Sequence, residues 1–357
     1  MYTAKYVFNG HSFLEDHALC ISEGIISSIV PIHTVPPEKI SEHSYYIIPS
    51  FLDAQVYGAR MKLFAVYPTP DTLHEMYEEF KEQGTTYFLP TVATNTSETI
   101  YNCIDAIHAY WQGGGKGVGG LHLEGPYINP TRRGAHIKEL IRFPEYSEIK
   151  KLLEFARGAI KMITLAPELC SKEIIQLIQN NGIVISAGHS NATYEQCIHA
   201  FNNGINTVTH LYNAMSPFHH REPGMVGAVF QHPAVKASII ADGLHVDFAA
   251  LKIAKELMGD RLFLITDAVT ETNEGFYQHT REGDKFSSAG ILSGSSLSML
   301  KAVKNCAEFA DIDLRECFRM ASLYPAQMLG INRGLIAEGM PADLIMLNEM
   351  FEINREK

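Results

Sequence analysis

The chain has 357 residues, of which 46% are hydrophobic, and a formal net charge of -11. This length and hydrophobic content allow a large core, and length alone is compatible with two or three domains. The acidic balance and the lack of a basic run argue against binding to the phosphate backbone of a nucleic acid. A small anionic ligand stays possible, because it needs only a local cluster of donors.

The N-terminal segment, residues 1–8, lacks the long apolar stretch of a signal peptide. No apolar run approaches the roughly 20 residues of a membrane helix. The six cysteines are scattered and form no Cys-x-x-Cys pair, which favours reduced thiols over disulfides or a zinc ribbon. We therefore predict a cytoplasmic protein with no membrane contact and no nucleic-acid partner.

Both ends of the chain are rich in short apolar segments separated by turn residues. The candidate strands lie at 5–8, 17–21, 24–30 and 342–347. Because chain termini often lie close together, we predict that the two ends pair in one small β domain.

The middle of the chain alternates between candidate strands and helices. The strands lie near 47–53, 85–91, 119–124, 161–168, 183–189, 207–212, 236–242 and 261–267. Helices are expected after Thr69-Pro70, Ser171 and Asp247, which are good N-cap residues or begin with proline. Repeated strand–helix units with near-continuous apolar strands imply a parallel sheet. Eight units predict a (β/α)₈ barrel, with an open doubly wound sheet as the alternative.

Four of these strands end in a polar residue that can carry chemistry. Glu124 ends the third, His189 the fifth, His210 comes near the end of the sixth, and Asp267 ends the eighth. In a (β/α)₈ barrel the active site is built at the C-terminal ends of the strands. The four side chains are therefore expected to meet in one site.

Glu124, His189 and His210 can together hold one divalent metal ion and leave a position open. The mixed oxygen and nitrogen donors suit Zn²⁺, and Fe²⁺, Mn²⁺ or Co²⁺ are alternatives. Asp267, which is not needed as a ligand, can take a proton from water. Taken singly, each residue has a structural explanation: a histidine at a strand end is often only hydrogen-bonded, Asp267 can cap a helix, and Glu124 can pair with Arg132. The shared position favours a metal site.

A series of short motifs occurs along almost the whole chain in the order of one known family. The motifs are Pro49-Ser-Phe-Leu-Asp53, His122-Leu-Glu-Gly-Pro126, Ala187-Gly-His-Ser190, Thr209-His-Leu-Tyr-Asn-Ala-Met215, Arg221-Glu-Pro-Gly224, Ala241-Asp-Gly-Leu-His245, Ile265-Thr-Asp-Ala268, Gly334-Leu-Ile-Ala-Glu-Gly339 and Ala342-Asp-Leu344. The sequence resembles the N-acetylglucosamine-6-phosphate deacetylase family of the amidohydrolase superfamily.

The resemblance implies a (β/α)₈ barrel at 50–334 and a small β-sandwich domain built from 1–49 and 335–357. It implies hydrolysis of the N-acetyl group of an amino-sugar 6-phosphate to the free amine and acetate. Family members are commonly dimers, in which the arginine that matches Arg221 can reach the neighbour's site. A homodimer is therefore expected.

The same resemblance assigns roles to individual residues. It implies that Glu124, His189 and His210 bind the metal, that Asp267 activates water and protonates the leaving amine, and that His245 polarises the acetyl carbonyl or binds substrate. The positions that match sugar and phosphate contacts are Ala135, His136, Asn213, Ala214, Arg221, His245, Leu292, Ser293 and Gly294. Without the resemblance, each of these polar residues is explained equally well by a structural role. Arg221 could be a plain exposed arginine, His136 and His245 could be hydrogen-bonded structural histidines, and Asn213 could cap a helix.

One position departs from a pattern common in amidohydrolases, in which a His-x-His pair after the first strand holds a second metal. Here the residues are Gln55-Val-Tyr57. Neither glutamine nor tyrosine is a good zinc ligand, and Lys161 lies at the wrong end of its strand to become a bridging carbamylated ligand. We therefore predict one metal ion per subunit.

Two further hypotheses stay open. The substrate could be the galactosamine epimer or another N-acyl amine, because sequence does not fix the direction of one hydroxyl. The chain could instead be a non-catalytic scaffold, although such proteins usually lose ligands and all four strand-end residues are present here.

Overall fold

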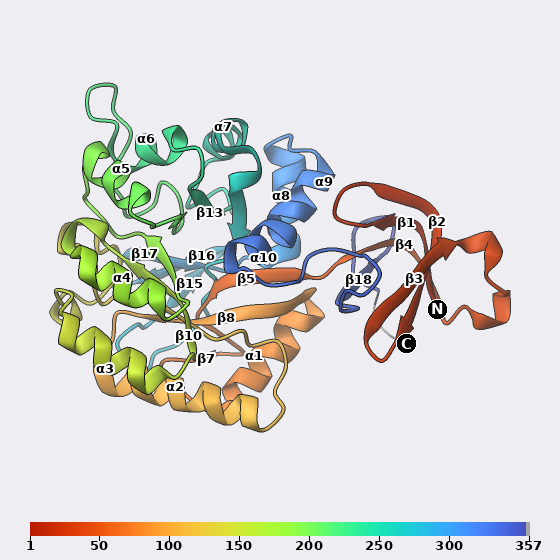
Figure 1. Cartoon of the computed structure of the whole chain (residues 1–357), viewed down its shortest axis with the longest axis horizontal. Coiled ribbons are helices and arrows are strands. Elements are labelled where there is room, and N and C mark those ends of the chain that lie inside the picture. Colours follow the sequence, from red (N-terminus) through yellow and green to blue (C-terminus); the bar gives the residue numbers. More distant parts are fainter. Residues whose placement is uncertain (355–357) are drawn as a thin grey trace.

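The computed structural model describes residues 1–354. Figure 1 shows a barrel of strands surrounded by helices and, beside it, a smaller sheet that contains the N-terminus. Within residues 1–354 no helix is both long and apolar enough to cross a membrane. The six cysteines all lie in this range and are free thiols.

The barrel is one sheet of eight parallel strands in sequential order. Its strands are β5 (Phe51–Val56), β8 (Thr85–Ala93), β9 (Leu121–Glu124), β10 (Ile160–Leu165), β11 (Val184–Ala187), β12 (Thr207–Val208), β13 (Lys236–Ile240) and β14 (Leu262–Ile265). The first and last strands approach each other where Asp267 N donates to Gln55 O at 3.1 Å and Tyr57 N donates to Ala268 O at 2.9 Å. The predicted (β/α)₈ barrel is therefore confirmed, and the open doubly wound sheet is excluded.

Helices cover the outside of the barrel. They are α1 (Pro70–Glu82), α2 (Ser97–Gln112), α3 (Tyr146–Ala156), α4 (Lys172–Asn180), α5 (Tyr194–Asn202), α6 (Gly224–Gln231), α7 (Phe248–Met258), α8 (Met299–Phe309), α9 (Leu314–Ala321) and α10 (Leu323–Leu329). The side chains of Thr69, Ser171 and Asp247 accept hydrogen bonds from the first turns of α1, α4 and α7. The three predicted helix starts are thus confirmed, because each N-cap oxygen satisfies a free N–H of its helix.

The smaller sheet combines both ends of the chain in the order β18-β4-β1-β2-β3. Its strands are β1 (Tyr2–Phe8), β2 (Phe13–Ser22), β3 (Ile25–Pro31), β4 (Glu42–Pro49) and β18 (Leu344–Leu347). Residues of these strands pack with the segment before β18 in a small apolar core that includes Leu19, Ile26, Ile336 and Met340. The predicted pairing of the termini is confirmed. The exact domain boundaries stay a prediction, and residues 355–357 of that assignment lie outside the described range.

Two small antiparallel sheets lie in the loops that follow β5 and β14. One consists of β6 (Gly58–Ala59) and β7 (Lys62–Leu63), and the other of β15 (Thr280–Glu282), β16 (Lys285–Ser288) and β17 (Ile291–Ser295). The two loops touch where Met61 N donates to Thr270 Oγ1 at 2.9 Å. Together they form one wall at the mouth of the barrel.

Three barrel strands are shorter than expected, and this places the polar residues differently. The strands β11, β12 and β14 each stop two residues before His189, His210 and Asp267. All three residues have positive φ, at 46°, 37° and 55°. This left-handed conformation is uncommon for residues with a side chain, and strain of this kind clusters at functional sites. The prediction that these residues lie within their strands is therefore corrected: they lie in the turns that follow. Glu124 does end β9.

Candidate metal centre and active site

Glu124, His189 and His210 converge at the mouth of the barrel. Glu124 Oε1 lies 3.3 Å from His189 Nε2 and 3.1 Å from His210 Nε2, and the two nitrogens are 3.1 Å apart. All three side chains are buried. Three electron-rich atoms this close repel one another unless a proton or a cation lies among them. The structure thus brings the three predicted metal ligands together.

The geometry of these atoms fits a divalent ion. Zinc ligands at about 2.0–2.1 Å in a tetrahedral arrangement stand about 3.3–3.4 Å from one another, close to the observed separations. His189 Nδ1 faces the backbone oxygen of Arg132 at 2.9 Å, so Nδ1 donates a hydrogen bond to that oxygen and Nε2 is the nitrogen directed at the candidate metal position. Such a partner for the second ring nitrogen is typical of metal-binding histidine. His210 Nδ1 is buried and has no hydrogen-bond partner among residues 1–354.

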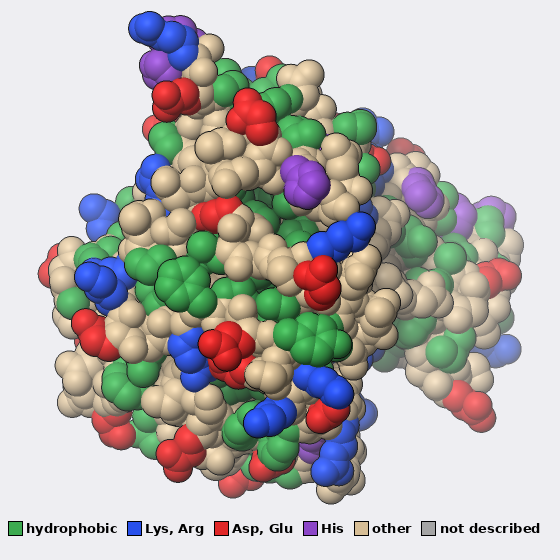
Figure 2. Space-filling model, turned by 60° about the vertical axis from the view of Figure 1, so that its left-hand side comes forward, with side chains coloured by type: hydrophobic (Ala, Val, Ile, Leu, Met, Phe, Trp, Pro, Cys, Tyr) green, Lys and Arg blue, Asp and Glu red, His purple; other side chains and the backbone are tan. Residues whose placement is uncertain are grey.

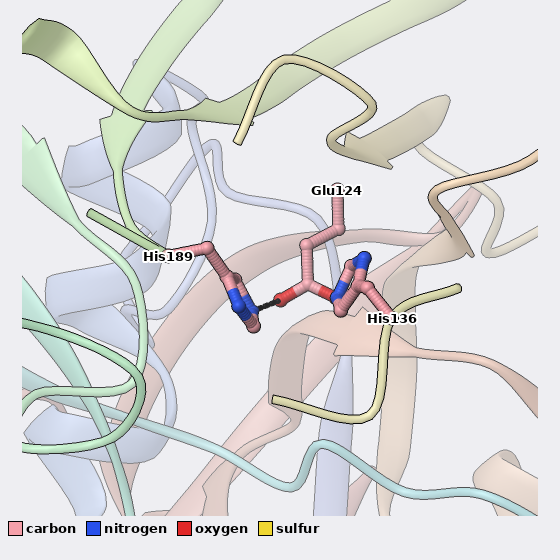
Figure 3. Close-up of side chains that lie close together, drawn as sticks. All are labelled: Glu124, His136 and His189. Atoms are coloured by element: carbon pink, nitrogen blue, oxygen red, sulfur yellow. Dashed lines mark hydrogen bonds and ion pairs between the residues drawn. The ribbon is translucent and has the colours of Figure 1, made fainter. Parts of the chain in front are cut away.

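His136 lies against the same carboxylate. Its Nε2 is 3.1 Å from Glu124 Oε2, while its Nδ1 is 2.7 Å from Thr94 Oγ1. Figure 3 shows the carboxylate of Glu124 between the rings of His136 and His189. These three residues form a second possible group of metal ligands. The structure therefore brings His136, predicted as a substrate contact, into the candidate metal centre.

Gln55 and Tyr57 reach the site from the end of β5. Gln55 Nε2 is 2.9 Å from Glu124 Oε1 and 2.7 Å from Asp267 Oδ1, so one amide nitrogen contacts both carboxylates. The Tyr57 hydroxyl donates to Glu124 Oε2 at 2.5 Å. The residues that replace the His-x-His pair thus donate hydrogen bonds in this structure.

Burial and neighbouring charge give Glu124 and Asp267 opposite protonation tendencies. Burial alone would raise the pKa of Glu124, but its close contacts with His136, His189 and His210 outweigh burial and hold that pKa well below its usual range. Burial raises the pKa of Asp267 well above its usual range, and the nearby charges of Glu124 and Asp53 raise it further. Two carboxyl groups in different environments can take different roles in proton transfer.

A cavity of about 210 Å³ opens over these residues. It is lined by Glu124, His189, His210 and Asp267 and by most of the predicted substrate positions, namely Ala135, His136, Asn213, Ala214, His245, Leu292, Ser293 and Gly294. His245 Nδ1 lies 2.6 Å from Asp242 Oδ2, an interaction that orients the ring. The cavity is the natural place for a small substrate.

Arg221 is the one predicted substrate position that the structure does not bring to the cavity. It lies on an exposed loop before α6, where its Nε is 3.2 Å from His220 Nε2. This loop projects from the barrel in Figure 1, and a tip rich in basic and histidine side chains projects from the same edge in Figure 2. Within residues 1–354, the side chains that line the cavity include no lysine or arginine.

Two cavity residues carried no signal in the sequence. The Tyr277 hydroxyl donates to Thr94 O at 2.6 Å, and His279 Nδ1 lies 2.9 Å from Ser293 Oγ. Burial lowers the pKa of His279 to about 4, so its ring is neutral at physiological pH. Both residues come from the loop after β14, which has no strand-end pattern to mark them.

Comparison with known proteins gives a consistent result. A model of the amidohydrolase family matches residues 46–357. The N-acetylgalactosamine-6-phosphate deacetylase of Escherichia coli O157:H7 is 32% identical over 99% of this chain and 96% of its own length. The N-acetylglucosamine-6-phosphate deacetylase of Bacillus subtilis is 33% identical over 93% of this chain and 89% of its own. The crystal structure of the Pasteurella multocida N-acetylglucosamine-6-phosphate deacetylase superposes with a TM-score of 0.93 at 31% identity, covering 99% and 96% of the two chains.

Proposed function

The chain belongs to the amidohydrolase family, and we propose that it hydrolyses N-acetyl-D-glucosamine 6-phosphate to D-glucosamine 6-phosphate and acetate in amino-sugar catabolism. The observation that carries the proposal is the convergence of Glu124, His189 and His210 beside Asp267 in the cavity. Relatives that carry this activity in their names cover nearly the whole chain.

One divalent ion per subunit is proposed at Glu124, His189 and His210, with Zn²⁺ as the resident ion and Fe²⁺, Mn²⁺ and Co²⁺ as alternatives that suit the same donors. When bound, such an ion would polarise the amide carbonyl and lower the pKa of a water molecule, so that hydroxide is available as the nucleophile at neutral pH. His136, beside Glu124, either binds the sugar or adds a further nitrogen to the ion.

Asp267 and His245 are the proposed catalytic residues. Asp267 takes a proton from the attacking water and then delivers it to the leaving amine nitrogen. Burial raises the pKa of this carboxyl, and the positive charge of a bound ion would lower it again, so that the carboxylate could accept the proton. His245, held by Asp242, donates a hydrogen bond to the acetyl carbonyl oxygen or a sugar hydroxyl. Ala135, Asn213, Ala214 and the segment 292–294 are proposed to position the sugar.

We propose that the chain forms a homodimer, because the described residues of one chain bring no lysine or arginine to the cavity for the phosphate group. Arg221 carries such a cation on an exposed loop, and a guanidinium group recognises phosphate through paired hydrogen bonds. In a dimer this loop would supply Arg221 to the neighbouring cavity. The six free thiols agree with a cytoplasmic location.

The galactosamine epimer is the second candidate substrate, because relatives named for each epimer match the chain at similar identity. The two epimers differ in the direction of one hydroxyl. Loop residues at the cavity wall would distinguish the epimers through their contacts with that hydroxyl.

The test is release of free amine from each of the two N-acetyl sugar phosphates by native, chelator-treated and zinc-restored protein. Release from the glucosamine compound that a chelator abolishes and zinc restores is the expected result. Release from the galactosamine compound alone would keep the chemistry and replace the substrate. No release from either compound by protein that holds its metal would contradict the proposal.

A further inference from the structure

The two oxygens of Glu124 have different partners. Oε2 accepts a 2.5 Å hydrogen bond from the Tyr57 hydroxyl and lies 3.1 Å from His136 Nε2. Oε1 faces His189 Nε2 and His210 Nε2. Oε2 thus accepts from the Tyr57 hydroxyl and faces His136, whereas Oε1, which also accepts from Gln55 Nε2 at 2.9 Å, points at the two nitrogens that would share an ion with it.

A hydroxyl on a carboxylate restricts how the carboxylate can bind a cation. A carboxylate can bind a metal ion through one oxygen or through both. A short hydrogen bond to an ionised acceptor is among the strong ones. Rotation of Glu124 to place both oxygens on one ion would break the bond from Tyr57. The hydroxyl therefore favours binding through Oε1 alone.

Gln55 adds to this restriction from the other side. Its Nε2 contacts Glu124 Oε1 and Asp267 Oδ1 at 2.9 and 2.7 Å. The amide places its partial positive charge between two acidic groups, where a second cation could otherwise bind. Its own oxygen is buried without a partner, so the side chain holds this orientation for the contacts of its nitrogen.

We propose that Tyr57 is a positioning residue whose hydroxyl holds Glu124 as a one-oxygen ligand, while Gln55 occupies the place of a second cation. The inference rests on the proposed metal centre. It assigns a function to the two residues that stand where many amidohydrolases carry His-x-His. Tyr57 acts through Glu124 and not on the substrate.

The alternative is that Tyr57 only packs. Its ring lies against a small apolar cluster of Leu63, Ala93 and Tyr277. Tyr57→Phe separates the two explanations, because it keeps the ring and removes the hydroxyl. Tyr127→Phe is the matched control: Tyr127 is fully buried three residues after Glu124, but its hydroxyl donates to Glu148 at 3.2 Å.

The experiment measures metal binding by the full-length chain, independently of turnover. Metal-depleted native protein and both variants are titrated with Zn²⁺ against a chromogenic chelator, and their Co²⁺ forms are compared by visible absorption, which reports the number of ligands. We expect one ion per native chain. Tyr57→Phe should bind about 10- to 100-fold more weakly, the usual effect of losing a partner of a metal ligand, and its Co²⁺ bands should weaken as Glu124 binds through both oxygens.

Tyr127→Phe should keep the native affinity within about twofold and the native Co²⁺ spectrum. If Tyr57→Phe binds Zn²⁺ with native affinity and its Co²⁺ form has the native spectrum, this inference is wrong, but the proposed metal centre still stands. Two ions bound tightly by the native chain overturn the part assigned to Gln55. A native chain that binds no ion overturns the metal centre itself, and this inference with it.

Discussion

The cavity and the loop before α6 are built in opposite ways. In the cavity Glu124, His189 and Asp267 are buried and in contact with neighbouring polar groups. On the loop Arg221 is exposed, and Phe218 is 60% exposed although it is apolar. Among residues 1–354, the cavity is lined by the groups proposed for amide hydrolysis but by no lysine or arginine, whereas the loop carries the exposed Arg221. Chemistry and phosphate binding should therefore respond to separate mutations.

The largest loss of activity should come from a substitution in the cavity. Asp267→Asn keeps the shape of the side chain but removes the group proposed to move the proton, so turnover should fall about 10³-fold or more. Stopped assays of amine release would measure the loss. Zinc content determined on the same sample should stay at one ion per chain, because Asp267 is not a proposed ligand. A variant that turns over at the native rate would contradict the role of Asp267.

The convergence of four cavity residues could be predicted because it follows a simple pattern, while their chemical roles stay a prediction. Glu124, His189, His210 and Asp267 each come at or just after an apolar run, and parallel strands of a barrel bring such positions to one end. The left-handed turns at His189, His210 and Asp267 were not predictable, since the local sequence does not mark where a strand stops.

Contacts that depend on loops could not be predicted. Tyr277 and His279 enter the cavity because the loop after β14 folds over the mouth, and Tyr57 meets Glu124 because β5 and β9 lie on the same side of the barrel. These arrangements depend on the spatial packing of segments far apart in sequence. Arg221 was found only through family resemblance, and one chain alone does not place it in the cavity.

The second-largest loss of activity should come from a substitution on the loop before α6. Arg221→Ala removes a charged hydrogen-bond donor worth about 1.5–3 kcal/mol, so kcat/KM for the phosphorylated substrate should fall about 10- to 100-fold, mainly through KM. Hydrolysis of N-acetylglucosamine without phosphate, compared between the native chain and the variant, is the control and should change little. Equal losses of kcat/KM on both substrates would show that Arg221 does not recognise the phosphate group.

Mixed dimers would sharpen the result further. Co-expressed Asp267→Asn and Arg221→Ala chains, purified through two different tags, should form heterodimers in which one site has an intact Asp267 and receives Arg221 from the other chain. Such heterodimers should recover about half of the native activity, since one of two sites is complete. Heterodimers no more active than the parent variants would contradict the exchange of the loop.

The smallest effect concerns Asp53, which is buried on β5 inside the barrel. Its carboxylate accepts hydrogen bonds from Thr266 N and Oγ1 and from Gln55 N, but burial outweighs these bonds and raises the pKa to about 7. The folded chain therefore holds this proton more tightly than the unfolded chain, and the free energy of unfolding falls as pH rises through that value.

Between about pH 6 and pH 8 the contribution of Asp53 should fall by about 1.4 kcal/mol. Asp53→Asn cannot titrate, so the native chain should lose this much more stability than the variant over the same interval. Urea unfolding of both zinc-loaded proteins at the two pH values would measure the difference. Parallel pH dependence in the two proteins would mean that Asp53 is already ionised at pH 6, and that water or the neighbouring N–H groups offset its burial more than the geometry indicates.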